Sequence, residues 1–469
     1  MTTIPQNREL LKNILTLLEA HRKIFKQERI YLRGVALVLA ELLVFARHTV
    51  TQMLWTLGLN EADWSAWYRL FSEGRFQVDQ ASSVLLAETL KHVREDEIYV
   101  VAGDGTQTLR SSGKMEGVGW LRNMRTPPFK IGIHHAQRWF NGSWLMPTEQ
   151  GYSRALPLRW LPAFTPKAKR QRYEAYKEWE AAVQFVHWLR QQFKVLGREQ
   201  QPLLMVADGS YDTLELWKQL PEGVSMLARS AKNRILKHLP SASAHGNRKY
   251  GERAASPQQF WQQRSGWHKI QWLIRGQQRD LQYRVEGPFL RPGAPATPLF
   301  LLIVRGQSYR KHGRSKHREP VPYLVNAISD PQGRWQLPFT ATTLIFWAWQ
   351  RWEVEVCHRE LKSNFGLGNK QCWNPQAAVI SVQWSAWVYS LLLLAGYRTG
   401  GLCGAPSVPT RWWRGSRRWS LNTLWRAYRA ALWGEPVFRP LWSLTRTDWF
   451  EKEACLQALT NAAFASARS

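Results

Sequence analysis

The chain has 469 residues, 44% of them hydrophobic, which excludes a disordered chain and provides for the cores of roughly two to four domains. Lys and Arg total 64 against 35 Asp and Glu, and the net charge of +29 predicts a polyanionic partner, foremost nucleic acid. A generally basic, solubilised surface is the alternative. Four scattered cysteines without a CxxC pair or zinc spacing, and an N-terminus without a charged-then-apolar leader, predict a cytoplasmic protein with reduced thiols.

Residues 1–97 are expected to form a helical domain, because apolar residues recur at helical spacing along much of this segment. Within it, Thr49 is placed to cap a short helix, Gly58 to supply a left-handed turn, and Asn60 to cap the next helix. This outline is that of a helix-turn-helix, which would seat one helix in a DNA groove. A helical bundle with tight turns gives the same pattern and is the alternative.

Residues 98–233 predict the first part of an α/β core, because strand patterns alternate with helical ones. One apolar run ends at Asp104 and another ends in the same way at Asp208. The expected strands are 98–104, 129–140, 143–152, 203–208 and 225–229, and the expected helices are 167–193 and 213–220.

Residues 234–343 predict a β-rich insertion, since short β-like stretches alternate here with Gly, Pro and basic loops. A dense basic loop lies within this insertion at residues 309–318. The phosphate contacts expected from it are Arg310, Lys311, Arg314 and Lys316. A solvated loop without a ligand is the alternative.

Residues 344–400 predict the second part of the core. A tryptophan-rich helix carrying Glu355 is expected from 346 to 365, ended by Gly366. The apolar run 377–397 that follows is nearly long enough to cross a bilayer, but serines and a glutamine interrupt it. We therefore expect a buried core helix and no membrane partner.

Residues 401–469 form a basic C-terminal region in which arginines interleave with tryptophans. Arginine and indole together can grip a sugar-phosphate backbone and stack on exposed bases, so Arg417 and Arg418 are candidate phosphate contacts. Arginine stems packed on tryptophan faces in an amphipathic tail are the alternative.

The three acids Asp104, Asp208 and Glu355 are the candidate catalytic residues and metal ligands. Converging carboxylates can hold two divalent cations, which is the machinery for cutting and joining phosphodiesters. An acid before a glycine at a strand end is commonly a turn former, and this holds for either aspartate alone. The order of strand acid, strand acid and helix acid in a strongly basic chain favours the metal site.

The helix acid has basic neighbours at helical spacing. Arg351 precedes Glu355 by four residues and Lys362 follows it by seven, so all three lie on one helix face. Such a face presents a carboxylate to a metal while two cations reach neighbouring phosphates.

These features resemble a bacterial DDE transposase with a ribonuclease-H-like core, of the insertion-sequence 701 and insertion-sequence 4 type. The helix signature of that group runs Tyr, two residues, Arg, three, Glu, six, Lys, and Arg351, Glu355 and Lys362 match it. The resemblance therefore selects Glu355 as metal ligand, ahead of Glu353 and Glu360. The signature's tyrosine falls on Ala348, which leaves the handling of the second strand, including a hairpin intermediate, unassigned.

The resemblance implies an α/β fold: a ribonuclease-H-like core interrupted by a β-rich insertion, with an all-helical N-terminal domain and a basic C-terminal region. It also implies two Mg²⁺ ions, which Mn²⁺ can replace, and cut-and-paste transposition. The partners would be terminal inverted repeats and target DNA, bound by a homodimer on paired ends in the bacterial nucleoid. A catalytically inactive DNA-binding repressor and another ribonuclease-H-like nuclease are the alternatives.

Overall fold

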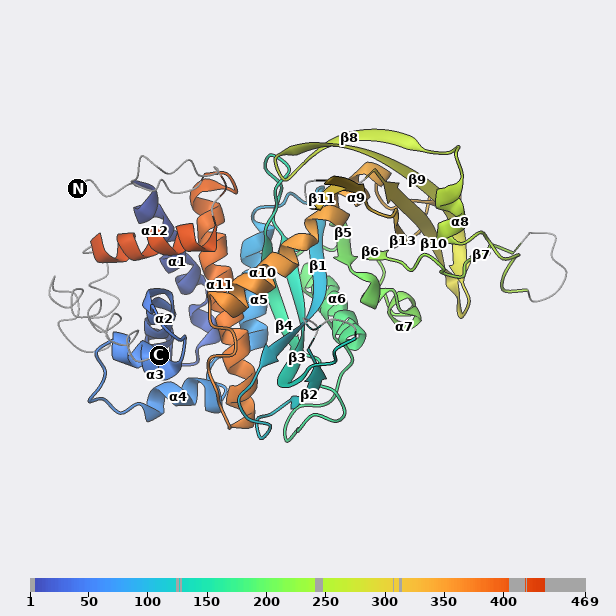
Figure 1. The fold of residues 1–469 in the computed structure, drawn as a ribbon. Helices are drawn as coiled ribbons and strands as arrows, with labels where there is room; N and C mark the ends of the chain where they lie inside the picture. The colour runs from blue at the N-terminus through green and yellow to red at the C-terminus, as the bar shows by residue number, and fades with distance from the viewer. Residues whose placement is uncertain are drawn as a thin grey trace.

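A computed structural model (Figure 1) describes most of the chain. It covers residues 5–123, 126, 129–240, 248–306, 308–311, 314–404, 418 and 420–434. A body made of helices lies beside a body built on one large sheet, and the long helix α11 runs between them (Figure 1).

The helical body joins the two ends of the chain. Helices α11 and α12 pack against α1 and other N-terminal helices, so the C-terminal segment completes the N-terminal bundle. The helices of this body are α1 Pro5–Ala20, α2 Glu28–Leu43, α3 Val50–Thr56, α4 Ser65–Ser72, α5 Val78–Leu90, α11 Pro375–Gly400 and α12 Leu421–Gly434.

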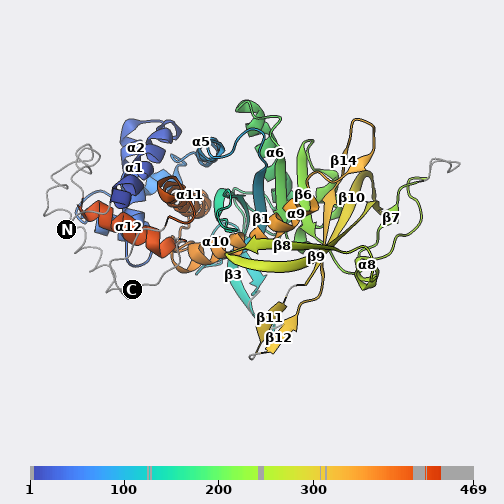
Figure 2. The same ribbon diagram turned by 90° about the horizontal axis from the view of Figure 1, so that it is seen from above.

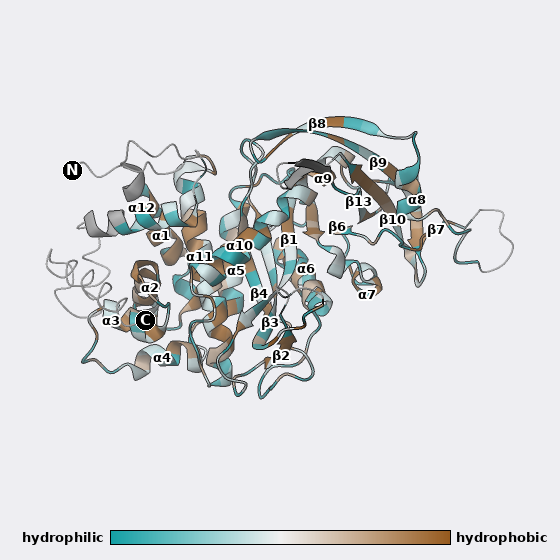
Figure 3. Ribbon diagram, in the orientation of Figure 1, coloured by the Kyte–Doolittle hydropathy of each residue, from teal (hydrophilic) through white to brown (hydrophobic). Residues whose placement is uncertain are grey.

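Helix α11 is the apolar segment for which two interpretations were weighed. Within the described part of the chain it alone is long and apolar enough to cross a membrane, and 94% of its most apolar window is buried. The hydrophobic colouring of α11 and α2 in Figure 3 follows their packing inside the helical body. The expected buried core helix is therefore confirmed.

The segment predicted as a helix-turn-helix has only part of the expected geometry. The Thr49 hydroxyl caps α3 by accepting the Gln52 N–H, and Gly58 has a φ of 68°, as expected. Asn60 does not cap the next helix, because α4 begins only at Ser65. The Asp63 carboxylate accepts the Ser65 N–H instead, so a longer connection separates the two helices.

The first half of the large sheet contains both parallel and antiparallel strands. Strands β3, β1, β5 and β6 are neighbours in that order, and β1, β5 and β6 run parallel while β3 and β4 are antiparallel. The mixed sheet with helices on both faces fits a ribonuclease-H-like DDE fold. Its strands in this half are β1 Tyr99–Leu109, β2 Val118–Arg122, β3 Ile133–Leu145, β4 Ala155–Pro162, β5 Leu203–Ala207 and β6 Val224–Arg229.

The prediction of separate strands at 129–140 and 143–152 is wrong, because β3 runs unbroken through Gly142. A Cβ at this glycine would lie 2.4 Å from the ring of Phe185 in α6 (Glu178–Val195). Gly142 therefore permits close packing of a helix on the strand, at the place where the two expected strands were separated.

The expected helix at 167–193 is wrong in its first part, because α6 begins only at Glu178. The buried carboxylate of Glu116 accepts the backbone N–H groups of Gln171, Arg172 and Tyr173. These three groups are thereby held by a side chain from another segment, and the backbone here follows a loop.

The β-rich segment after residue 234 extends the same sheet. Strand β13 pairs antiparallel with β6, and β10 and β9 follow, so the sheet order is β2-β3-β1-β5-β6-β13-β10-β9-β7. The remaining elements are β7 Lys237–His238, α8 Pro257–Gln262, β8 His268–Ile274, β9 Gln277–Arg291, β10 Ala294–Arg305, β11 Ser308–Lys311, β12 Arg314–His317, β13 Val321–Asn326, β14 Ile328–Ser329 and β15 Trp335–Gln336. Helices α7 Leu214–Lys218, α9 Ala341–Gln350 and α10 Trp352–Ser363 complete the fold.

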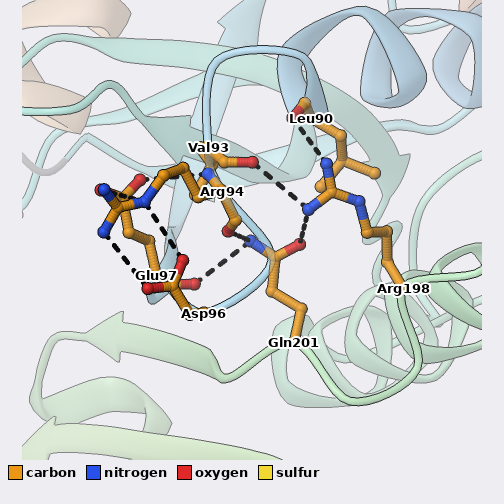
Figure 4. Close-up of polar contacts among 7 residues, drawn as sticks. All are labelled: Leu90, Val93, Arg94, Asp96, Glu97, Arg198 and Gln201. Carbon is orange, nitrogen blue, oxygen red and sulfur yellow. Dashed lines mark hydrogen bonds and ion pairs between the residues drawn. The ribbon is translucent and has the colours of Figure 1, made fainter.

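The starts of the two acid-bearing strands are fastened to each other (Figure 4). The Gln201 amide donates to the backbone oxygens of Arg94 and Glu97, just before β1. Arg198 donates to the Leu90 and Val93 carbonyls and to the Gln201 side chain. Because Gln201 lies just before β5, this network fixes the position of β1 relative to β5 along the strand direction.

A buried ion pair joins the helical body to the segment after α10. Lys370 Nζ lies 2.6 Å from Glu41 Oε1, and the Ser385 hydroxyl and Trp384 indole N–H also donate to this carboxylate. Both charged side chains are almost completely buried. The interaction therefore connects α2, α11 and the chain leaving α10.

Replacing Glu41 by Ala should lower the free energy of unfolding by about 3–5 kcal/mol, because the Lys370 charge would stay buried without its partner. Urea denaturation of the two proteins measures this difference. The matched control is Glu28→Ala, which removes the exposed Arg22–Glu28 pair and should cost less than about 1 kcal/mol. Equal losses in both variants would contradict the anchoring role of Glu41.

Candidate active site

Strand pairing brings the two aspartates together. In the parallel pairing of β1 and β5, Gly103 lies opposite Ala207. Asp104 follows Gly103 directly, and Asp208 follows Ala207 directly. Adjacent strands lie about 4.8 Å apart, so Asp104 and Asp208 leave neighbouring strands at the same level.

The surroundings of the two aspartates differ. Strand β5 ends before Asp208, whose carboxylate accepts the N–H and hydroxyl of Ser210. Strand β1 does not end at Asp104, contrary to the prediction, but continues to Leu109. It loses β5 as a neighbour there and keeps its pairing with β3.

Glu355 comes from α10, on the sheet face that Asp104 also occupies. The expected single helix over 346–365 is instead two helices, α9 and α10, that meet at Arg351. The Arg351 guanidinium donates to Glu355 at 2.7 Å and lies 3.9 Å from Asp104 Oδ2. The structure thus places the matched arginine between the first and third acids.

Among the three candidate acids, Asp104 has the clearly shifted pKa. Burial raises the pKa of this carboxyl to about 7; the nearby Asp208 and Glu355 charges add to the rise, while Arg351 and the Gly105 N–H oppose it. Since Asp208 and Glu355 both contribute, all three acids share one electrostatic environment.

Two residues that the sequence analysis did not select, Asn141 and His358, lie beside Asp104. Asn141 is the cross-strand partner of Asp104 on β3, and its amide lies 3.1 Å from His358 Nε2. The Ser143 hydroxyl donates to the amide oxygen of Asn141, which directs the Asn141 NH₂ group at the histidine. Nε2 therefore accepts, the proton resides on Nδ1, and Nδ1 lies 3.9 Å from Asp104 Oδ2.

His358 is neutral in this arrangement. Burial lowers its pKa to about 3, with smaller contributions from Lys362 and Arg351. A signal for His358 exists in the sequence, because it follows Glu355 by three residues and shares its helix face. Asn141 has no comparable signal, since its contact joins residues 217 positions apart.

The predicted phosphate contacts fall into different surroundings. Arg418 donates to the buried Glu353 and to the Ser153 carbonyl and lies over the Tyr152 ring, which favours the packing alternative for this arginine. The other carboxylate oxygen of Glu353 accepts from Arg275, in the turn between β8 and β9.

Lys362 is in the last turn of α10, close enough to His358 to affect its pKa. The basic loop forms the β11–β12 hairpin, which projects from the sheet (Figure 2). The side chains of Arg310, Lys311, Arg314 and Lys316, and the whole of Arg417, lie outside the described part of the chain.

The donor set suits a hard divalent cation, because three carboxylates supply only oxygen ligands. Within the described ranges, no three His, Cys, Asp or Glu side chains lie close enough together to hold one ion. The raised pKa of Asp104 nevertheless indicates that added positive charge would be favourable there. The residues thus fit a divalent metal chemically, and binding by all three would require their side chains to draw closer.

Comparison with known protein families agrees with this arrangement. The family model described as DDE superfamily endonuclease matches residues 23–283, more than half of the chain. The chain belongs to this family. No curated protein matches it. The matched span includes Asp104 and Asp208 and ends before Glu355, so the third acid rests on the geometry of α10.

Membership of the DDE endonucleases establishes the general activity. The protein is a nuclease of a family that acts on DNA, and its members generally use divalent metals. The metal chemistry of the carboxylates and the basic charge of the chain are consistent with that activity.

Replacing Asp104 by Asn should stabilise the metal-free protein above pH 7. Asp104 has a folded pKa of about 7, above its ordinary value near 3.8, so ionisation costs folding free energy as pH rises between these values. The benefit of the variant should be absent near pH 4 and reach at most about 4 kcal/mol above pH 7. Urea denaturation with a chelator at pH 4, 6 and 8 measures it.

The matched control is Asp280→Asn, at an exposed position on β9, which should show no such pH-dependent gain. A constant difference between wild type and Asp104→Asn across the three pH values would contradict the electrostatic account of Asp104.

His358 is expected to orient Asp104 for metal binding. Asn at this position retains an N–H close to the place of Nδ1, whereas Gln retains a polar group only near Nε2. His358→Gln should therefore lower Mn²⁺ affinity by about 10- to 100-fold, and His358→Asn by less. Titration calorimetry measures the affinities, and thermal unfolding verifies that both variants fold. Equal affinity in the two variants would argue against orientation through Nδ1.

Proposed function

We propose that this DDE endonuclease is a cut-and-paste DNA transposase of the insertion-sequence 701 or insertion-sequence 4 type. The observation that carries the proposal is the register of β1 and β5, which places Asp104 beside Asp208 while α10 brings Glu355 into electrostatic contact with Asp104. The spacing of Arg351, Glu355 and Lys362 supports the transposase type over other nucleases of this fold.

Asp104, Asp208 and Glu355 would hold two Mg²⁺ ions, which Mn²⁺ could replace. When bound, such ions supply a water of lowered pKa and neutralise charge at the attacking and leaving oxygens. The Gly105 N–H fixes one oxygen of Asp104, and His358 faces the other. Lys362 and a released Arg351 would bind phosphates next to the cleaved bond.

The DNA substrates would be terminal inverted repeats and, after cleavage, target DNA attacked by the freed 3′ hydroxyl. The net charge of +29 supports strong, salt-sensitive DNA binding. We also propose that the basic β11–β12 hairpin contributes phosphate contacts, that a homodimer assembles on paired ends, and that the protein acts in the cytoplasm at the bacterial nucleoid.

Cleavage should require each acid. Asp208→Ala and Glu355→Ala should each lower the rate of cutting by more than about 100-fold, since a lost metal ligand removes several kcal/mol of charge stabilisation. The assay uses labelled DNA carrying the sequences that flank the gene, with Mg²⁺ or Mn²⁺. DNA affinity should change little, and Glu222→Ala, at an exposed acid before β6, is the control that keeps full activity.

Cutting that survives the loss of either acid would refute the assigned site. Salt-sensitive binding of the wild type with no cleavage under either metal would support the catalytically inactive repressor. Cleavage of RNA–DNA hybrids in preference to the flanking DNA would support another ribonuclease-H-like nuclease.

A further inference from the structure

The β2–β3 hairpin exposes an unusual number of large apolar side chains. Trp120 is 65% exposed and Phe129 is 91% exposed, and other apolar residues near them are similarly open. Single exposed apolar residues are ordinary, but a group within one short segment marks a binding surface. We call this group the hairpin surface, and it consists of Trp120, Phe129, Ile131 and Ile133.

Trp120 has a defined position on this surface. It pairs across the strands with His135, and the two rings lie with centroids 3.8 Å apart. Two residues further along each strand, Arg122 pairs with Ile133. The Asn123 N–H then donates to the Gly132 carbonyl at the end of the hairpin. The indole is therefore held by a neighbouring ring while much of it remains open to solvent.

Trp120 and Ile133 of the hairpin surface lie on the same face of the sheet as Asp104. Side chains alternate along a strand, so His135 and Asn141, six residues apart on β3, point to one face. Asn141 is the partner of Asp104, and His135 is the partner of Trp120. Six residues of strand span roughly 20 Å, which places Trp120 about that far from Asp104 along β3.

The charge around the hairpin surface is positive. Between residues 105 and 148 the sequence has a single acid, Glu116, which is buried and bound to backbone N–H groups. Arg122 and Lys130 are exposed. A second copy of the chain would bring the same positive charges face to face, whereas a polyanion would complement them.

We propose that the hairpin surface binds unpaired bases of the DNA beside the cleaved end, with Trp120 stacking on a base and Arg122 and Lys130 contacting phosphates. Exposed aromatic rings recognise base faces, which are accessible only where the strands are unpaired. This inference rests on the proposed function for the position of the DNA.

Trp120→Ala tests the proposal by fluorescence anisotropy without divalent metal, using a labelled 20-nucleotide single strand and a 20-base-pair duplex. The affinity for the single strand should fall by roughly 5- to 100-fold, and that for the duplex by less than about twofold. Trp120→Phe should restore most of the affinity because it keeps an aromatic face. Trp335→Ala removes another exposed tryptophan, on β15, and is the control expected to bind as wild type.

Unchanged single-strand affinity in Trp120→Ala would overturn the proposal, and so would equal losses for single strand and duplex. A change of oligomeric state in sedimentation, with DNA affinity intact, would instead assign the surface to a second copy of the chain. Because no cleavage is measured, selective loss of single-strand binding would sustain this inference even if the protein did not cut DNA. Unaltered binding by Trp120→Ala would reject it without affecting the proposed function, which the separate cleavage assay with Asp208→Ala and Glu355→Ala tests.

Discussion

The burial of one carboxylate, Asp104, near two other acids governs how the active site is built. Asp104 and Asp208 cannot separate, because the pairing of β1 with β5 fixes where each leaves the sheet. Glu355 is fixed on α10, and the burial of Asp104 makes its negative charge costly. Arg351 offsets part of that cost by contacting both Asp104 and Glu355. A divalent metal would also offset this negative charge. Both the Arg351 contact and a bound metal would therefore stabilise the ionised form of Asp104.

Ion pairs on the other faces of α10 hold the helix beside the site. Glu353, within the first turn of the helix, is held by Arg275 and Arg418. Glu360 in the next turns is bound by Arg154 and the Tyr389 hydroxyl, the latter from α11. Acids facing away from the site are thus satisfied by structural partners, whereas Glu355 is partly exposed and engages a residue of the site itself. This difference in surroundings separates the candidate ligand from its neighbours along the helix.

The sequence predicted the features that depend on residues close together along the chain. Apolar runs that end in an acid indicated Asp104 and Asp208, and helical spacing indicated Arg351 with Glu355. It could not predict Asn141, whose role depends on strand register and on a helix far along the chain. The division into strands 129–140 and 143–152 was wrong because the close approach of the Phe185 ring to Gly142 depends on a helix from another part of the chain. The helix at 167–177 failed for a similar reason, since a distant carboxylate, Glu116, holds that backbone.

The strands contributed by residues 234–343 continue the catalytic sheet through the pairing of β13 with β6. An engineered miniature enzyme made by excising this segment would therefore uncover the backbone hydrogen-bonding edge of β6. Open edges of this kind recruit other strands and promote aggregation. The excision would also remove Arg275, a partner of the buried Glu353. A compact derivative would thus require a redesigned edge and would leave Glu353 with Arg418 alone of its two arginine partners, so shortening the loops that join these strands is the more practical route to a smaller protein.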